Sequence, residues 1–295
     1  MLLRLALQSM GTRFELVLCG DSERDLRAAG EDALREIEDG DRRWSLFRRD
    51  SVLAHVNRCA ARGWTAVDAD TFELLELAGR VHAASGGAFD PSVAPRMRAL
   101  GLQERPGATA PNAPVGWHHV QLDGARRAVR FARAGVELDL GGIAKGFALD
   151  LAARALRGAG VERALLHGGT STALALGAPP GAQPWQIAIG PDEGAPVVPL
   201  AHAALSVSSP AGRRVEPREE HGGRTIGHVL DPQSGGDVPH ARRAAVIAPA
   251  AGVADAWSTA LLVEGARPPA DLEVLLGEND GTRTHWQRIP RKESA

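Results

Sequence analysis

Apolar and polar residues alternate at the start of the chain, which is typical of strands with one buried face. The alternation predicts two strands, over Leu2–Leu7 and Arg13–Leu18, joined by a turn at 8–12. From Ser22 to Asp39, apolar residues recur every three or four positions, which predicts an amphipathic helix. A second helix of this kind is expected to begin near Asp70, because aspartate favours the N-cap position.

The remainder of the chain mixes short apolar runs with helical periods, and residues 101–116 are rich in Pro, Gly and Ala, as linkers are. Short strands are predicted near Val120 and Val129 and over 136–140, 164–167, 173–176, 185–189, 205–208, 226–230 and 244–248, and further helices over 142–156, 252–263 and 269–276. Several strands adjoin without a helix between them, which favours an α+β fold over a doubly wound parallel sheet. We therefore expect a single large domain over residues 1–277, followed by a polar tail over 278–295.

Charge and composition exclude several classes of protein. The chain carries 34 basic and 36 acidic side chains and a net charge of −2, so it offers no basic field for nucleic acid. No run approaches the ~18–20 consecutive apolar residues of a transmembrane helix. Two cysteines are too few for a disulfide scaffold or a Cys-rich zinc site. The first residues lack the pattern of a signal peptide or of a lipid-anchored cysteine. We expect a cytoplasmic protein as the sequence is written, and a periplasmic or membrane-anchored one only if a leader is missing from it.

Lysine is rare in this chain, which contains only Lys145 and Lys292, and tyrosine is absent. Lys145 follows Asp139-Leu140-Gly141-Gly142, where a strand is expected to end, two glycines allow a tight turn and a helix begins. Such a junction presents backbone N–H groups and the positive end of a helix to an anion such as phosphate. A plain Gly-Gly turn with an exposed lysine explains the same residues equally well. The spacing is not that of a P-loop.

A second polar group falls on the helix expected over 252–263. Asp255 and Thr259 share one helical face at i and i+4, beside Ser258, and oxygen ligands of this kind suit Mg²⁺. The competing interpretation is an aspartate that interacts with the helix dipole and a threonine bonded to its own backbone.

Two further features are candidates for chemistry. His228 and Asp231 lie close together where a strand runs into an Asp-Pro turn, a place where a general base could act. Phe47 and Phe89 fall in loops beside polar groups. Aromatic rings in loops either stack on planar ligands or pin the loop to the core.

These segments occur in a fixed order along residues 9–259. They are Ser9-Met10-Gly11-Thr12, Trp44-Ser45-Leu46-Phe47 with Asp50-Ser51 and Asn57, Gly87-Ala88-Phe89-Asp90-Pro91, Asp139-Leu140-Gly141-Gly142-Ile143-Ala144-Lys145-Gly146, His167-Gly168-Gly169, His228-Val229-Leu230-Asp231-Pro232 with Ser234-Gly235, and Ala254-Asp255-Ala256 with Ser258-Thr259. In this order they resemble the ApbE family of FAD:protein FMN transferases. The resemblance implies an ApbE-like (T-fold-like) α+β fold of mixed sheets with packed helices.

The resemblance also implies an activity and a site. Such an enzyme binds FAD with Mg²⁺, moves FMN onto a Thr or Ser hydroxyl of a target flavoprotein through a phosphoester bond, and releases AMP. By similarity, His228 would be the base for the acceptor hydroxyl, and Lys145 would lie near the FAD phosphates. The metal would be held by the backbone carbonyl of Ala144 and by Asp255 and Thr259, with Ser258 as a further ligand. FAD would lie against Met10, Phe47, Ala88, Phe89, Asp90, Gly141, Phe147 and Val229.

The sequence departs from the family pattern at two places. Thr170-Ser171 follows Gly168-Gly169 where the family commonly has Asn, and Phe47 occupies a position where a Tyr would add a phenol hydrogen bond. Two other functions are compatible with the same residues. One is a Mg²⁺-dependent FAD pyrophosphatase, in which water replaces the acceptor hydroxyl and the products are FMN and AMP. The other is a non-catalytic FAD-binding protein that stores or delivers flavin, although such a protein needs neither a base nor a metal.

Overall fold

The computed structural model describes residues 1–102, 113–179, 181, 183–190, 194–210, 214–215, 226–227 and 229–290. An eight-stranded sheet runs through these residues, and every neighbouring pair of its strands is antiparallel. In spatial order the strands are β1 (Leu2–Ser9), β2 (Thr12–Cys19), β6 (Arg163–Gly168), β7 (Thr172–Leu176), β10 (Ala203–Ser208), β13 (Arg242–Ala248), β14 (Glu273–Asn279) and β15 (Thr284–Ile289). The spatial order of the strands therefore follows their order in the chain.

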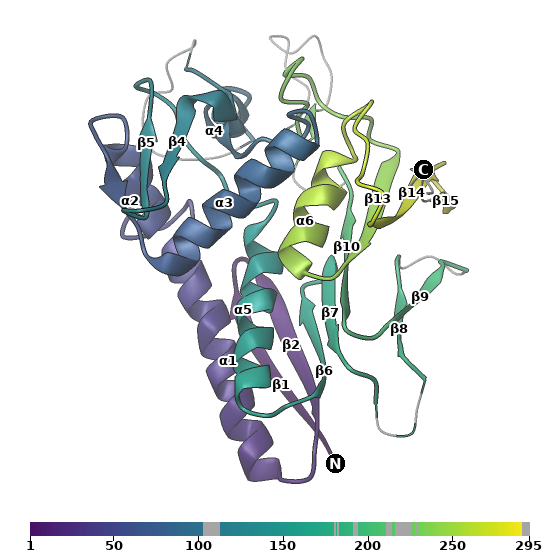
Figure 1. Ribbon diagram of the computed structural model, residues 1–295. Helices are drawn as coiled ribbons and strands as arrows, with labels where there is room; N and C mark the ends of the chain where they lie inside the picture. Colours follow the sequence, from purple (N-terminus) through teal and green to yellow (C-terminus); the bar gives the residue numbers. More distant parts are fainter. Residues whose placement is uncertain are drawn as a thin grey trace.

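Helices cover one face of this sheet (Figure 1). They are α1 (Glu23–Trp44), α5 (Ala144–Gly158) and α6 (Ala251–Ala260), while α3 (Ala69–Ala84) packs on α6. Helix α1 packs on β1, β2 and α5, while α5 and α6 pack side by side, α5 over β6 and β7 and α6 over β7, β10 and β13. The start of α1 is capped by Ser22, whose hydroxyl accepts a hydrogen bond from the Asp25 backbone N–H. The apolar stripe of α1 faces the sheet and forms the main core with α5.

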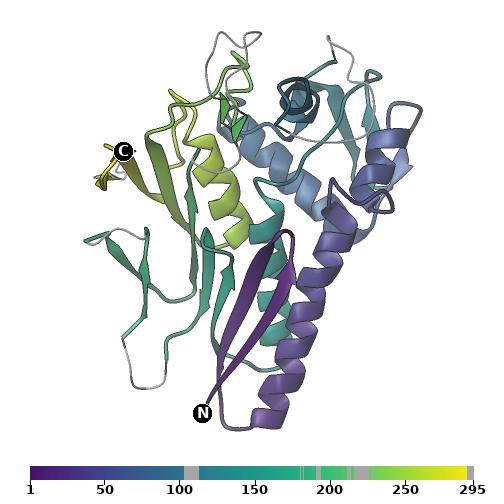
Figure 2. The same cartoon turned by 180° about the vertical axis from the view of Figure 1, so that it is seen from behind.

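The opposite face of the sheet is partly covered by a hairpin of β8 (Trp185–Ala188) and β9 (Val197–Leu200), which is visible from behind in Figure 2. A second apolar cluster fills the space beneath it and includes Leu165, Leu205 and Leu275. Central strands of the sheet are therefore buried on both faces. Strand β7 is buried at every position, which explains why it reads as a continuous apolar run.

A smaller group of elements packs at one end of the molecule, beside α3 (Figure 1). It contains α2 (Val52–Cys59), α4 (Ala94–Ala99) and a three-stranded sheet of β3 (Thr65–Ala66), β5 (Ala128–Phe131) and β4 (Val120–Asp123). Short 3₁₀ turns lie at Pro91–Val93 and Trp117–His119, and β11 (Arg214–Val215) pairs with β12 (Ile226–Gly227). Among the described residues, no helix has both the length and the apolar character that crossing a membrane requires.

The predicted α+β class is confirmed, but the strand predicted over Val136–Leu140 is wrong. Among the described residues, this segment has no regular secondary structure and pairs with no strand. The side-chain amide of Asn57 donates to the Leu138 carbonyl (3.0 Å) and accepts from the Leu138 N–H (2.8 Å). The Asp139 N–H donates to the Pro91 carbonyl (2.7 Å). A side chain and a loop therefore take the place of a neighbouring strand.

The prediction for the end of the chain is also wrong. The helix predicted over 269–276 is replaced by a turn and the start of β14, and the predicted polar tail contributes the end of β14 and all of β15. Val274 and Leu275 are both buried, on opposite faces of the sheet, so β14 lacks the alternation by which an amphipathic strand is recognised. The linker predicted over 101–116 lies mostly outside the described residues.

Candidate active site

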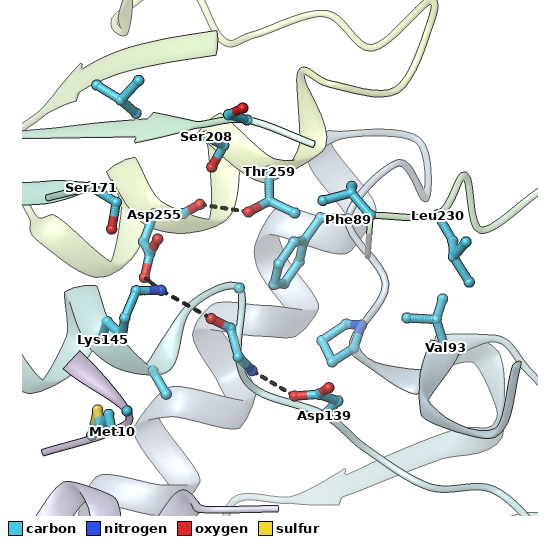
Figure 3. Close-up of a pocket in the computed structure, with 18 of the residues that line it drawn as sticks. Met10, Phe89, Val93, Asp139, Lys145, Ser171, Ser208, Leu230, Asp255 and Thr259 are labelled. Atoms are coloured by element: carbon cyan, nitrogen blue, oxygen red, sulfur yellow. Dashed lines mark hydrogen bonds and ion pairs between the residues drawn. The ribbon is translucent and has the colours of Figure 1, made fainter. Parts of the chain in front are cut away.

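A cleft of about 1220 Å³ opens where the first turn of α5 and the second half of α6 meet the β1–β2 turn and the loop before α4 (Figure 3). Most of the residues predicted for the site line it. These are Met10, Phe47, Ala88, Phe89, Asp90, Gly141, Ala144, Lys145, Val229, Asp255 and Thr259. Segments that are far apart in the sequence therefore meet at one surface.

The first turn of α5 forms one wall of the cleft. The Asp139 carboxylate accepts a hydrogen bond from the Gly141 N–H (2.8 Å), which closes the turn that precedes the helix. At Gly142, an added Cβ would lie 3.3 Å from both Phe89 and the Thr259 hydroxyl, so a larger residue would crowd the cleft. The ammonium of Lys145 donates to the Gly141 carbonyl at 3.2 Å. Lys145 is thus held at the start of α5.

Asp255 is the central carboxylate of the cleft and is only 3% exposed. Its Oδ2 accepts from the Gly146 backbone N–H of α5 (3.0 Å) and lies 3.5 Å from Lys145 Nζ. Its Oδ1 accepts from the Ser206 hydroxyl at 3.3 Å. A buried carboxylate is stable only when it is paired and hydrogen-bonded, and here a helix N-terminus and an ammonium meet that need.

A group of hydroxyls behind Asp255 links α6 to the sheet. Ser258 donates to the Asp255 carbonyl (3.0 Å) and to Ser206 Oγ (3.2 Å), and it lies 2.7 Å from Ser208 Oγ. Thr172 Oγ1 lies 3.1 Å from Ser206 Oγ. The sequence analysis missed Ser206, Ser208 and Thr172. A serine at every second position of an apolar strand is a signal that could have indicated Ser206 and Ser208.

Two neighbouring residues near the end of α6, Ser258 and Thr259, differ in their access to the cleft. Thr259 lines the cleft, and its hydroxyl donates to the Asp255 carbonyl at 3.1 Å. Ser258, predicted as a further metal ligand, is fully buried and lies outside the cleft lining. The backbone hydrogen bond of Thr259 matches the competing interpretation of this pair, while the position of Asp255 in the cleft matches the functional one.

The loop that carries Phe89 and Asp90 is held by its own polar groups. Asp90 Oδ1 accepts from both the N–H and the hydroxyl of Ser92, and its Oδ2 accepts from the Trp117 N–H at 3.0 Å. Phe89 is 4% exposed and packs into the core, whereas Phe47 is 58% exposed at the rim. Phe89 therefore pins its loop while presenting an edge to the cleft, and Phe47 is the ring that remains accessible.

Met10 reaches the cleft from the tip of the β1–β2 hairpin. The two turn residues, Met10 and Gly11, have φ values of 48° and 71°. A turn with two left-handed residues matches the twist of a two-residue hairpin, but it is strained for a side chain larger than Asn or Gly. This turn directs the Met10 side chain to the cleft that it lines.

Two predicted residues are placed elsewhere. Phe147 is 2% exposed and packs edge-on against Trp44, with ring centroids 5.5 Å apart, so it belongs to the core and not to the cleft lining. The physical reason is that Phe147 lies on the broad buried face of α5, which is apolar. His228 lies outside the described residues; its neighbour Val229 lines the cleft.

The fold and the site together define a class of protein: an α+β scaffold in which the start of α5, a lysine and a buried carboxylate face a cleft suited to a phosphorylated ligand. A comparison with protein families gives the family. The ApbE family model matches residues 10–275, and the chain belongs to the ApbE family.

Relatives and solved structures agree with this assignment. The chain is 28% identical over 276 residues to a protein of Klebsiella pneumoniae, covering 88% of this chain and 77% of the relative. It is 29% identical over 262 residues to a protein of Treponema pallidum, covering 82% and 72%. Both are named FAD:protein FMN transferase. The fold matches the ApbE protein of Thermotoga maritima with a TM-score of 0.83 at 24% identity, covering 98% and 97% of the two chains.

Proposed function

We propose that this enzyme, an FAD:protein FMN transferase by family and by the name of its relatives, transfers FMN from FAD to a Thr or Ser hydroxyl of a target flavoprotein with the help of Mg²⁺. The acceptor oxygen attacks the phosphorus on the FMN side of the pyrophosphate. The bond from that phosphorus to the bridging oxygen breaks, AMP leaves with the bridging oxygen, and a phosphoester joins FMN to the acceptor.

The observation that carries this proposal is the buried Asp255 of α6, which lies against the first turn of α5 with Lys145 beside it in the cleft. A pyrophosphate needs cationic and N–H groups, and attack on it increases the charge on the phosphate oxygens. Lys145 supplies a cationic donor for those oxygens, and the positive end of the α5 dipole favours them. The cleft volume of about 1220 Å³ exceeds the ~300–1,000 Å³ usual for small ligands, which accommodates a dinucleotide together with an acceptor segment.

The residues around Asp255 fit a magnesium ion. The Asp255 carboxylate and the Thr259 hydroxyl line the cleft with Ala144, whose carbonyl we propose as a third ligand, and all three offer the oxygen ligands that Mg²⁺ prefers. Lys145 Nζ lies 3.5 Å from Asp255 Oδ2, so the ion would share this carboxylate with the ammonium. When bound, the ion would neutralise charge on the phosphates.

The remaining roles fall to the loops. We propose that His228 accepts the proton of the acceptor hydroxyl, since a hydroxyl is a poor nucleophile until a base takes its proton. Gln233 Nε2 donates to the Gly86 carbonyl at 3.0 Å, which ties the segment after His228 to the loop that carries Phe89. Two segments that line the cleft are therefore joined to each other. The accessible ring of Phe47 can stack on the flavin or the adenine.

The proposal is tested with purified protein, FAD, Mg²⁺ and a flavoprotein domain that contains a Thr or Ser acceptor. Transfer adds the mass of one FMN, less one water, to the domain, and the acceptor residue is then found by peptide mass spectrometry. An acceptor variant with Ala at that residue is the control. Free FMN and AMP with an unmodified acceptor would indicate the pyrophosphatase instead, and FAD left intact across acceptors and divalent ions would indicate a storage protein.

A further inference from the structure

Helix α6, which carries Asp255 and Thr259, is capped by a residue from another helix. In the part of the chain that the structure describes, no side chain next to the start of α6 caps it, since its N-cap residue is Ala250. Instead, Asp150 of α5 accepts from the Ala251 N–H through Oδ1 (2.7 Å) and from the Gly252 N–H through Oδ2 (2.8 Å). Both oxygens of one carboxylate are thus used to hold the first turn of α6.

The capping is reciprocal. Helix α5 likewise lacks a side-chain cap from its own N-terminal residues within the described chain, and the Gly146 N–H in its first turn donates to Asp255 of α6 at 3.0 Å. Between the two carboxylates the helices touch closely, because a Cβ added at Gly146 would lie 2.2 Å from the Ala251 carbonyl oxygen. Two carboxylates and one glycine contact therefore fix α6 relative to α5.

We infer that Asp150 is a positioning residue for FMN transfer, which holds α6 so that Asp255 and Thr259 face the start of α5. The inference rests on the proposed function, in which these residues and Lys145 share one ligand. Asp150 itself is separate from the cleft: it borders a small cavity of about 230 Å³ on the other side of the helix pair. Outer residues that orient metal ligands typically change affinity or activity by about 10–100-fold when they are replaced.

The charges around Asp150 come from three elements. Arg154 and Arg157 lie on its own helix, Glu73 and Arg80 on α3, and the amide N–H groups on α6; β7 contributes the apolar Leu174. Burial raises the pKa of Asp150 to about 6, although the two amide hydrogen bonds and the arginines oppose the rise. Above that pH, both carboxylate oxygens of Asp150 accept hydrogen bonds from the backbone N–H groups of α6. Below it, one oxygen carries a proton and can no longer accept as strongly from its N–H, so the cap weakens in mild acid.

The test compares Asp150→Asn with Asp68→Asn. Asn at 150 keeps the shape but places an NH₂ donor against a backbone N–H. Asp68 caps α3 through the Thr71 N–H, so Asp68→Asn also removes a capping carboxylate, but from a helix outside the cleft lining. Two quantities are measured on the whole protein: FAD affinity with Mg²⁺ and with EDTA, and hydrogen-exchange protection of residues 251–254, corrected for intrinsic rates. Wild type is measured from pH 5.0 to 8.0.

For Asp150→Asn at pH 7.5 we expect the gain in FAD affinity due to Mg²⁺ to fall by about 10–100-fold, with FAD affinity in EDTA nearly unchanged. Hydrogen-exchange protection of residues 251–254 should fall as well. Asp68→Asn should match wild type in both FAD affinity and exchange protection. In wild type the Mg²⁺ gain should decline below about pH 6, which needs no variant to fold. Wild-type values for Asp150→Asn in both measurements, or equal losses in the two variants, would overturn the inference. If Mg²⁺ adds nothing to wild-type FAD affinity, the metal part of the proposed function fails, and exchange protection alone decides the role of Asp150.

Discussion

The closest helix contact of the site predicts a strong effect for Gly146→Ala. A Cβ at residue 146 would lie 2.2 Å from the Ala251 carbonyl oxygen and 2.8 Å from Asp255 Cβ, and the nearest atoms belong to backbone that cannot rotate away. Ordinary contact begins near 3.4 Å, so the helices must separate by about an ångström. That movement lengthens the 3.0 Å bond between the Gly146 N–H and Asp255 and both hydrogen bonds to Asp150.

The magnitude follows from two opposing effects. Alanine gains about 1 kcal/mol of helix propensity over glycine. Overpacking costs about 1–3 kcal/mol, and we take at least the upper end because the obstruction is backbone. The net expectation is a loss of about 2 kcal/mol in the free energy of unfolding. A displacement of about 1 Å at a binding site can also reduce activity by about 100-fold.

Gly158→Ala is the matched control, because it makes the same change in the same helix. No described atom lies within 4 Å of a Cβ at residue 158, so stability should stay the same or rise by up to about 1 kcal/mol. Urea unfolding gives both free energies, and flavin fluorescence gives FAD affinity with Mg²⁺. Equal stability and equal FAD affinity in the two variants would refute the close apposition of α5 and α6.

Three further predictions follow from the same structure. Lys145→Arg should weaken FAD binding by about 10-fold, because a planar fork cannot replace a compact ammonium held by Gly141, whereas Lys292→Arg should leave the affinity measured by fluorescence titration unchanged. The raised pKa of Asp150 means that the folded state binds the proton more readily than the unfolded one, so this group makes the free energy of unfolding fall by about 3 kcal/mol between pH 4 and 7. In urea unfolding, Asp150→Asn should lack this fall in the free energy of unfolding. Parallel pH dependences for the variant and wild type would contradict the prediction. Removing residues 280–295 should destabilise the protein by about 1–3 kcal/mol, since Trp286 and Ile289 leave the apolar clusters; an unchanged unfolding midpoint would restore the interpretation as a tail.

The sequence predicted those parts of the fold whose pattern is local. Strands β1 and β2 alternate, and α1 has a regular apolar stripe, so both could be recognised from residue spacing alone. Strand β14 could not, because burial on both faces removes the alternation. The segment 136–140 was misread for a different reason: it has the residues of a strand, but its hydrogen-bond partner is the side chain of Asn57, which is 81 positions away from Leu138.

In the candidate site, too, residues in local motifs could be predicted and residues whose roles depend on distant partners could not. Lys145, Asp255 and Thr259 were predicted because each lies in a short motif with a chemical meaning. Asp150 and Ser206 were missed because their roles depend on partners far along the chain: Ala251 is 101 positions from Asp150, and Asp255 is 49 positions from Ser206. Phe147 was assigned to the cleft from its place in a motif, although the periodicity of α5 directs its ring into the core. Local spacing identifies such residues but does not determine which side of a helix meets the ligand.

The spatial order of the eight strands has a consequence for how the protein matures. Since each strand pairs with the one that precedes it in the sheet and in the chain, the sheet can grow in one direction during synthesis, from the first hairpin onward. The ligand-binding surface cannot be built up in the same gradual way. Helix α6 is made after β13, and until it docks on α5 the Gly146 N–H has no carboxylate and Asp150 has no amide partners. We therefore expect a nascent chain to gain most of its sheet before it can hold flavin, so that competence to bind FAD marks the end of folding.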